Sequence, residues 1–166
     1  MVRASICCSA CFGVIATVVA LLLFGPLVSA APQALPTSPD GGACALLTPG
    51  EIAQTTGFKV GDGKAGHALP GVQGKCIWDG PGVAEEVIVV LSDSRHAEIT
   101  FAAVRGSGGT DVPGIGSKAV GNKNPSVVGG YVVLVQDAKG GFAVSTGRGG
   151  TRDNTIALAK IVESRR

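Results

Sequence analysis

The residues of this chain that could do chemistry are few and far apart. His67 lies in a glycine-rich segment and His96 lies in the first turn of an expected helix, and their spacing does not make them a metal pair. We expect His96 to be a solvated residue. Glu85 and Glu86 are neighbours in an extended segment, where successive side chains point to opposite faces. They therefore cannot serve one substrate as acid and base, and we predict neither catalytic nor metal-binding residues.

One glycine-rich motif, GIGSKA at residues 114–119, matches the relaxed Gly-x-Gly-x-x-Ala pattern of dinucleotide-binding loops. In that pattern the glycines let the backbone approach a pyrophosphate at the start of a helix. Pro113 precedes the match where a buried strand should end, and no helical pattern follows it. We therefore expect a turn that leads into a short strand. The chain also lacks the Gly-x-Ser-x-Gly elbow of serine hydrolases, and we predict no cofactor.

The N-terminal segment is typical of a secretory signal. Residues 1–30 carry one early cation, an apolar run and a Val-Ser-Ala ending, which favours cleavage before Ala31. An uncleaved membrane anchor is the alternative. Residues 31–43 are rich in proline and have no apolar periodicity, so they are expected to form an extended linker. This linker is either a disordered terminus or a spacer that lifts the domain off a surface.

Removal of the signal changes the cysteine count. Three of the five cysteines lie within residues 1–30, so only Cys44 and Cys76 would remain. An even pair in a chain sent to an oxidising compartment predicts a disulfide. The alternative of a redox or metal role has little support, because neither thiol has a neighbouring histidine or a Cys-x-x-Cys partner.

Composition limits the class of partner. The chain has 14 Lys and Arg against 12 Asp and Glu, a net charge of +2, and no basic stripe. Nucleic-acid affinity depends on neutralising phosphates, so nucleic acid is a poor candidate. Glycine is frequent and aromatic residues are few, which indicates many turns and a core of Val, Ile, Leu and Ala.

The clearest local signal is a short helix over residues 49–56. Thr48 and Glu51 have the spacing of a capping box, Pro49 occupies the first helical position, and Gly57 supplies a left-handed stop. Hydrophobic patterns and turn residues predict the other elements. These are strands near 75–79 and over 85–91, a helix capped by Asp93 or Ser94, a hairpin of YVVLVQ and FAVST, and a closing helix from Asp153 or Asn154 to Glu163. We predict one α+β domain over residues 44–166, with about three helices packed on an antiparallel sheet and one disulfide.

Taken together, these motifs resemble a known family. CALLTPGE at residues 44–51, then CIWDG, VPGIGSKAVG, a hairpin and a C-terminal ALAKIVESRR are similar to actinobacterial secreted and lipoprotein domains of unknown function with a Cys-x-Leu-Leu-Thr-x-x-Glu opening. The resemblance implies a fold like the small α+β accessory domains of the Mog1 and PsbP type, which bind partners and are not enzymes. The family's lipidated cysteine is absent, since the expected cleavage site reads VSAAP. This favours release or peptide anchoring over a lipid anchor.

Trp78 is the only tryptophan and shares a strand face with Cys76. It either packs against the disulfide and the first helix or forms the aromatic wall of a ligand groove, for which Gly114 and Gly116 are the further candidates.

Two functional hypotheses follow. The first is a noncatalytic binding or accessory domain, secreted or in the cell envelope, that meets a protein, lipid or wall component. The second is an enzyme whose residues are dispersed in the sequence. We expect a binding surface on the loop side formed by residues 60–74 and 106–117, because both segments are long and rich in glycine. The alternative is that these segments are tolerated insertions.

Overall fold

The computed structural model describes residues 42–67, 69–82, 84–124 and 129–166. The expected signal, residues 1–30, and residues 31–41 of the expected linker lie outside the described residues. Ala43, which the sequence places in the linker, is buried in the core. The helical elements are η1 (Ala43–Ala45), α1 (Pro49–Thr56), α2 (Ser94–Gly106) and α3 (Arg152–Ser164). The strands are β1 (Lys64–Ala65), β2 (Val72–Asp79), β3 (Glu86–Ser92), β4 (Thr110–Asp111), β5 (Lys118–Lys123), β6 (Tyr131–Asp137) and β7 (Gly140–Thr146).

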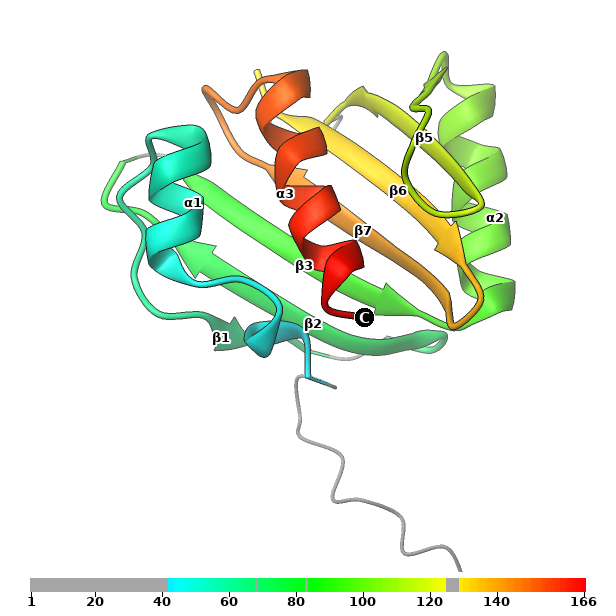
Figure 1. Cartoon of the computed structure of the whole chain (residues 1–166), viewed down its shortest axis with the longest axis horizontal. Coiled ribbons are helices and arrows are strands. Elements are labelled where there is room, and N and C mark those ends of the chain that lie inside the picture. The colour runs from blue at the N-terminus through cyan, green and yellow to red at the C-terminus, as the bar shows by residue number, and fades with distance from the viewer. Residues whose placement is uncertain (1–41, 68, 83, 125–128) are drawn as a thin grey trace, which may run out of the picture. The chain divides into compact units, whose positions relative to one another are not determined.

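Within the described residues the strands form one seven-stranded sheet in the order β1-β2-β3-β7-β6-β5-β4, and every neighbouring pair is antiparallel (Figure 1). Two meanders, β1 to β3 and β4 to β7, meet where β3 pairs with β7. The chain passes from the first meander to the second through α2. This arrangement confirms the predicted α+β class.

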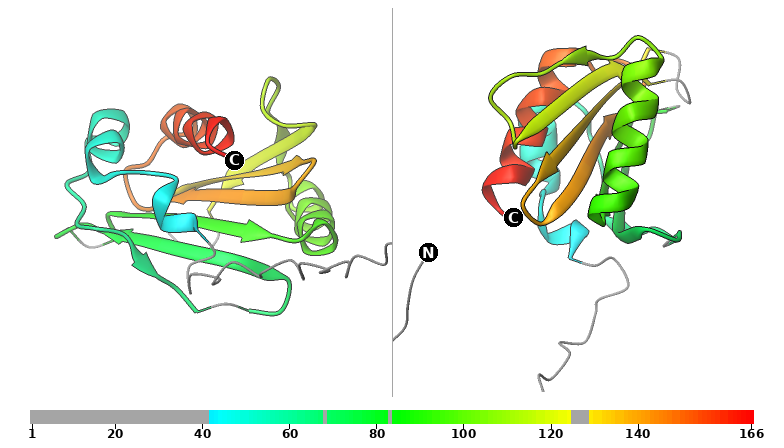
Figure 2. Two further views of the ribbon diagram at one scale, coloured as in Figure 1. Left: turned by 60° about the horizontal axis from the view of Figure 1, so that its bottom comes forward. Right: turned by 90° about the vertical axis from the view of Figure 1, so that its right-hand side faces the viewer.

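The helices cover the two faces of the sheet unequally. We call the face that carries Cys76, Val89 and Val144 the disulfide face; η1 and α3 pack on it, and α1 lies beside α3. The opposite face, which carries Lys75, Val90 and Ala143, is called the α2 face, because α2 packs on its β5 to β7 part. Figure 2 shows α2 on the other side of the sheet from α1 and α3. The outer surface of β2 and much of β3 is therefore left without a covering helix.

Helix α1 forms as the sequence predicts. The Thr48 N–H donates to the Glu51 carboxylate at 2.9 Å and the Glu51 N–H donates to the Thr48 hydroxyl at 3.3 Å, which is the capping box. Gly57 ends the helix with φ +79°. Arg165, after α3, donates to the Leu46 carbonyl at 2.9 Å and to both carboxylate oxygens of Glu51. The hydrogen bond from Arg165 lowers the pKa of Glu51 from 4.5 to about 2.

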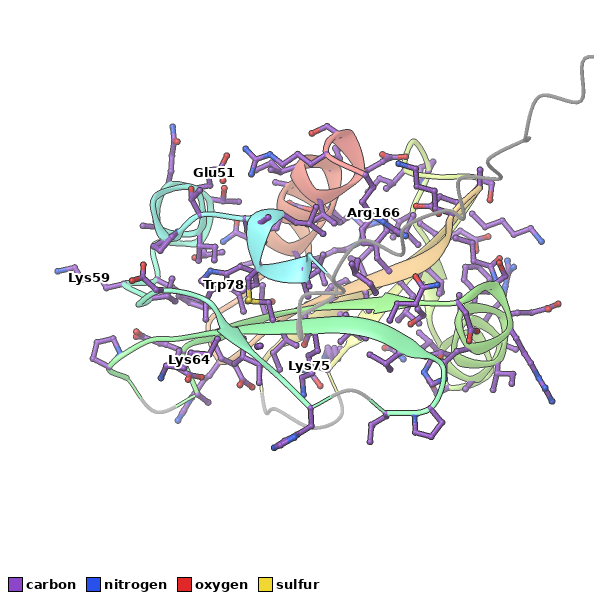
Figure 3. All side chains as sticks on the ribbon, turned by 90° about the horizontal axis from the view of Figure 1, so that it is seen from below. Glu51, Lys59, Lys64, Lys75, Trp78 and Arg166 are labelled. Atoms are coloured by element: carbon purple, nitrogen blue, oxygen red, sulfur yellow. A yellow bond between two sulfur atoms is a disulfide. The ribbon has the colours of Figure 1, made fainter. Side chains whose placement is uncertain are left out.

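The disulfide between Cys44 and Cys76 is present, with 5.0 Å between the Cα atoms, and it joins η1 to β2. Trp78 lies beside it and is 1% exposed (Figure 3). Gly63 passes directly over both side chains, since a Cβ at that position would lie 2.6 Å from the Cys76 sulfur and 2.8 Å from the Trp78 ring nitrogen. Trp78 is therefore a core residue. The alternative of an exposed groove wall is wrong, because the loop over the ring excludes a ligand.

The other predicted elements are present with one correction, whereas η1, β1 and β4 were not predicted. Asp93 caps α2, and β6 and β7 form the predicted hairpin. Helix α3 begins at Arg152 and not at Asp153 or Asn154. Its cap is Thr151, whose hydroxyl accepts the Asn154 N–H at 3.2 Å. An Asp in the first turn stabilises a helix start as an Asp cap would, and that similarity explains the error.

Candidate functional site

The register of the sheet builds the floor of a pocket on the α2 face. Lys75 pairs with Val90, Val90 with Ala143 and Ala143 with Leu134, so these four side chains form a row across β2, β3, β7 and β6. The row runs from a cation at the β2 end to leucine at the β6 end. Leu134 is buried beneath α2, while Lys75, Val90 and Ala143 are half-buried.

Helix α2 forms one wall of this pocket. The Asp93 carboxylate accepts the His96 N–H at 2.7 Å and fixes the start of the helix. Ala97 and Phe101, one turn apart, are buried against the sheet. His96 and Thr100 therefore project from the flank of α2 that faces the uncovered strands β2 and β3, and both line the pocket.

The segment between β1 and β2 forms the opposite wall. His67, Leu69 and Val72 line the pocket from this side. Gly71 adopts φ +83°, and a Cβ there would lie 2.8 Å from the Cβ and Nδ1 atoms of His96, so only glycine lets the loop pack against the imidazole. The Gly71 carbonyl also accepts the Asp93 N–H at 3.1 Å. These contacts hold the loop before β2 against the start of α2.

The resulting cavity has a volume of about 270 Å³. Its described lining is mostly apolar and contains no acidic side chain. Leu69, at the rim, is 66% exposed. The described lining residues are His67, Leu69, Val72, Lys75, Val90, Ser92, His96, Ala97, Thr100, Phe101, Leu134, Val135, Gln136, Phe142 and Ala143.

The ionisable side chains of the described lining, His67, Lys75 and His96, are all basic. Lys75 lies on the side of the sheet away from the disulfide (Figure 3), and its aliphatic stem lies under Gly66, where a Cβ would be 2.7 Å from the Lys75 Cδ. Among the described residues the Lys75 ammonium has no ion pair. Lys64 on the neighbouring strand differs, because its ammonium lies 3.6 Å from the Asp79 carboxylate. The pocket thus combines apolar walls with the ammonium group of Lys75, which has no counter-ion among the described residues.

The same side chains lack the geometry of a catalytic site. The Thr100 hydroxyl donates to the His96 carbonyl at 2.8 Å, and within the described part of the chain no hydroxyl is hydrogen-bonded to either imidazole. An activated nucleophile needs such a contact to a base. No group of three potential metal ligands occurs among the residues described. The arrangement supports binding and gives no support to nucleophilic catalysis.

A second hollow, of about 360 Å³, lies on the other side of α2 and contains Gly114 and Gly116. Several of its polar groups contact one another or other parts of the fold. The Gly116 N–H donates to the Glu163 carboxylate, and Arg105 binds Asp111 at 2.7 Å. Gly116 has φ +56° and approaches β6 so closely that a Cβ would lie 2.4 Å from the Gln136 carbonyl oxygen. The glycines therefore serve a turn into β5, as predicted, and this hollow is the weaker candidate.

The predicted loop side does not exist as one surface. Residues 60–74 include β1 and the start of β2, and residues 106–117 include β4. Strands β1 and β4 lie at opposite edges of the sheet. Part of the first segment lines the pocket, and part of the second lines the hollow across α2. The prediction failed because glycine content marks turns but does not say which turns meet.

The sequence did not reveal that His67, Lys75 and His96 face one pocket. His96 is half-buried under Gly71, so its assignment as a solvated residue is wrong. A signal for Lys75 was present: it alternates with Cys76 and Trp78 along β2, so it had to lie on the opposite face from the core. Only the register with β3 and the position of α2 brings the three basic residues together.

Comparisons of the chain with protein-family models, curated proteins and solved structures found no match. None of the helices in the described part of the chain has the length and apolar character needed to cross a bilayer. The disulfide is consistent with an oxidising environment outside the cytosol.

Proposed function

We propose that this protein is a secreted or cell-envelope binding domain without catalytic activity, and that its ligand occupies the pocket between α2 and the loop that precedes β2. The observation that carries the proposal is the cavity of about 270 Å³ with mostly apolar walls. Concave, largely apolar cavities with a few polar groups are the usual form of small-molecule sites.

Three further observations support the proposal. The disulfide and the signal-like segment 1–30 favour an extracytoplasmic site of action. The resemblance to actinobacterial secreted domains of the Mog1 and PsbP type favours a partner or ligand role over chemistry. Among the described residues the pocket contains no nucleophile bonded to a base. Of the partners considered, a lipid-like molecule suits apolar walls better than a protein or wall polysaccharide does.

The test is to fill the pocket and measure binding of a neutral apolar probe. Ala143 lies at the centre of the floor row, so Ala143→Leu adds three carbon atoms to the cavity. Ala157→Leu adds the same atoms at an exposed position of α3, on the other face. The probe is 1-nonanol, and binding to the purified full chain is followed by ligand-observed NMR and by amide shifts.

We expect wild type and Ala157→Leu to bind 1-nonanol with Kd on the order of 0.1 to 1 mM, the range for about ten non-hydrogen atoms. Ala143→Leu should weaken binding at least tenfold and leave the melting temperature equal or higher, because filling a cavity stabilises a core. The proposal is wrong if wild type shows no saturable binding, or if folded Ala143→Leu binds as well as wild type.

A further inference from the structure

We propose that the pocket beside α2 selects a single-chain amphiphile with an anionic carboxylate head, with the carboxylate at Lys75 and the apolar tail directed toward Leu134 and Phe101. This inference rests on the proposed function, since it names the ligand class of the same pocket. It adds head-group selectivity and an orientation, and neither follows from apolar walls alone.

The size of the cavity sets the length of the ligand. An apolar cavity of about 150 Å³ in a protein core accommodates benzene, which has six carbon atoms. A cavity of about 270 Å³ therefore accommodates roughly ten to twelve non-hydrogen atoms. This matches a medium-chain carboxylic acid with about nine carbons and excludes complete burial of a diacyl lipid.

The direction of the ligand follows from the floor row. Lys75 stands at one end, Val90 and Ala143 follow, and Leu134 stands at the other end under Phe101 of α2. Three strand spacings separate the ends by roughly 14 Å. The floor thus changes from charged and half-exposed to apolar and buried along one line, and a molecule with one polar end fits this gradient in one orientation.

The charge of the head group follows from the lining. Lys75 is the one lysine or arginine among the described lining residues, and none of those residues is acidic. Lys75 is half-buried as a residue, and its ammonium has no counter-ion among the described residues, so an anionic head group beside it forms a charge-assisted hydrogen bond. His67, on the loop, and His96, on the first turn of α2, also line the pocket and add hydrogen-bond donors. A cationic head group would meet three basic residues and no carboxylate.

Other occupants are less consistent with these observations. A peptide strand added to an exposed edge would use backbone hydrogen bonds, but the pocket lies on the face of the sheet and not along β1 or β4. A second copy of this chain would bring a broad surface to a cavity of only about 270 Å³.

The experiment compares three probes with the same nine-carbon chain, nonanoate, 1-nonanol and nonylammonium, on the purified full chain at pH 7 by calorimetry and amide NMR. The variants are Lys75→Met, which keeps an unbranched apolar stem and removes the charge, and Lys64→Met as the matched control. Lys64 lies on the same sheet face, two residues away across the β1–β2 pair, and its charge is paired with Asp79.

In wild type and Lys64→Met we expect nonanoate to bind about fivefold to tenfold more tightly than 1-nonanol, as one charge-assisted contact provides, and nonylammonium to bind most weakly. In Lys75→Met nonanoate should lose this advantage while 1-nonanol keeps its affinity. With nonanoate, the amides of Gly66 and Lys75 should shift more than with 1-nonanol.

Equal binding of nonanoate and 1-nonanol by wild type overturns the anionic head group and leaves the proposed function standing. Absence of saturable binding by all three probes overturns both. An undiminished advantage of nonanoate in Lys75→Met overturns the orientation. The wild-type comparison of the three head groups needs no variant, so the inference stays testable if Lys75→Met fails to fold.

Discussion

The two faces of the sheet differ in how extensively they are packed. Among the described residues the disulfide face belongs to a cluster of twenty buried hydrophobic residues, sealed by η1, α1 and α3, whereas the cluster under α2 has three: Phe101, Val120 and Leu134. A small domain needs one extensive core to offset chain entropy. With the disulfide face supplying that core, the α2 face is free to keep a cavity that a stability-optimised protein would have filled.

The strongest test of this contrast is to truncate one large side chain on each face. Trp78→Ala should lower the free energy of unfolding by about 3 to 5 kcal/mol, because the ring is fully enclosed and leaves a cavity. Val90→Ala, half-exposed on the pocket floor, should cost about 1 kcal/mol or less. Urea unfolding followed by far-UV circular dichroism measures both.

The fluorescence of Trp78 provides an independent check on the wild type. Emission should be blue-shifted and resistant to acrylamide quenching, since the ring is 1% exposed.

If Val90→Ala lowered the free energy of unfolding as much as Trp78→Ala does, the contrast between the two faces would be wrong. The α2 face would then carry as much of the stability as the disulfide face.

The second prediction concerns the disulfide. Replacing both Cys44 and Cys76 by alanine releases a constraint between residues 32 apart, which in the chain-entropy model costs about 3 to 4 kcal/mol. The pocket lies on the other face, so 1-nonanol should bind the folded double variant as it binds wild type. Calorimetry of melting and of binding measures the two effects. Loss of probe affinity in folded protein would show that the faces are coupled.

The first of these faces could be predicted from the sequence and the second could not. Cap residues such as Thr48 act on neighbouring backbone, and the alternation of Cys76 and Trp78 fixes one face of a strand, so local rules were enough for the helices and the hairpin. The disulfide followed from the number of cysteines outside residues 1–30. The short strands β1 and β4 carry no apolar pattern and depend on pairing to β2 and β5.

The pocket depends on longer-range geometry. His67 and His96 lie on separate elements, and the contact that sets their side of the pocket is the approach of Gly71 to His96. In the sequence Gly71 is one of many glycines. Which glycine packs against α2 follows from the register of β2 with β3 and from the side of the sheet on which α2 lies. Neither the register of β2 with β3 nor the side on which α2 packs can be predicted from a local sequence pattern.

The smallest effect we predict comes from the ion pair that joins α1 to α3 on the disulfide face. Arg165 lowers the pKa of Glu51 to about 2, so the ionised carboxylate is favoured by folding. Its contribution is complete above the ordinary value of 4.5 and is lost as the pH falls toward 2. The difference in melting temperature between wild type and Glu51→Gln should therefore be largest at pH 7 and close to zero near pH 2.

This difference should stay below the two effects above, because the side chains of Glu51 and Arg165 are 27% and 37% exposed. Scanning calorimetry at pH 7, 4, 3 and 2 measures it, and in an Arg165→Gln background most of the pH-dependent difference should disappear. A difference in melting temperature that grows as the pH falls would have the wrong sign for a carboxylate stabilised in its ionised form. The ion pair between Glu51 and Arg165 would then not stabilise the disulfide face.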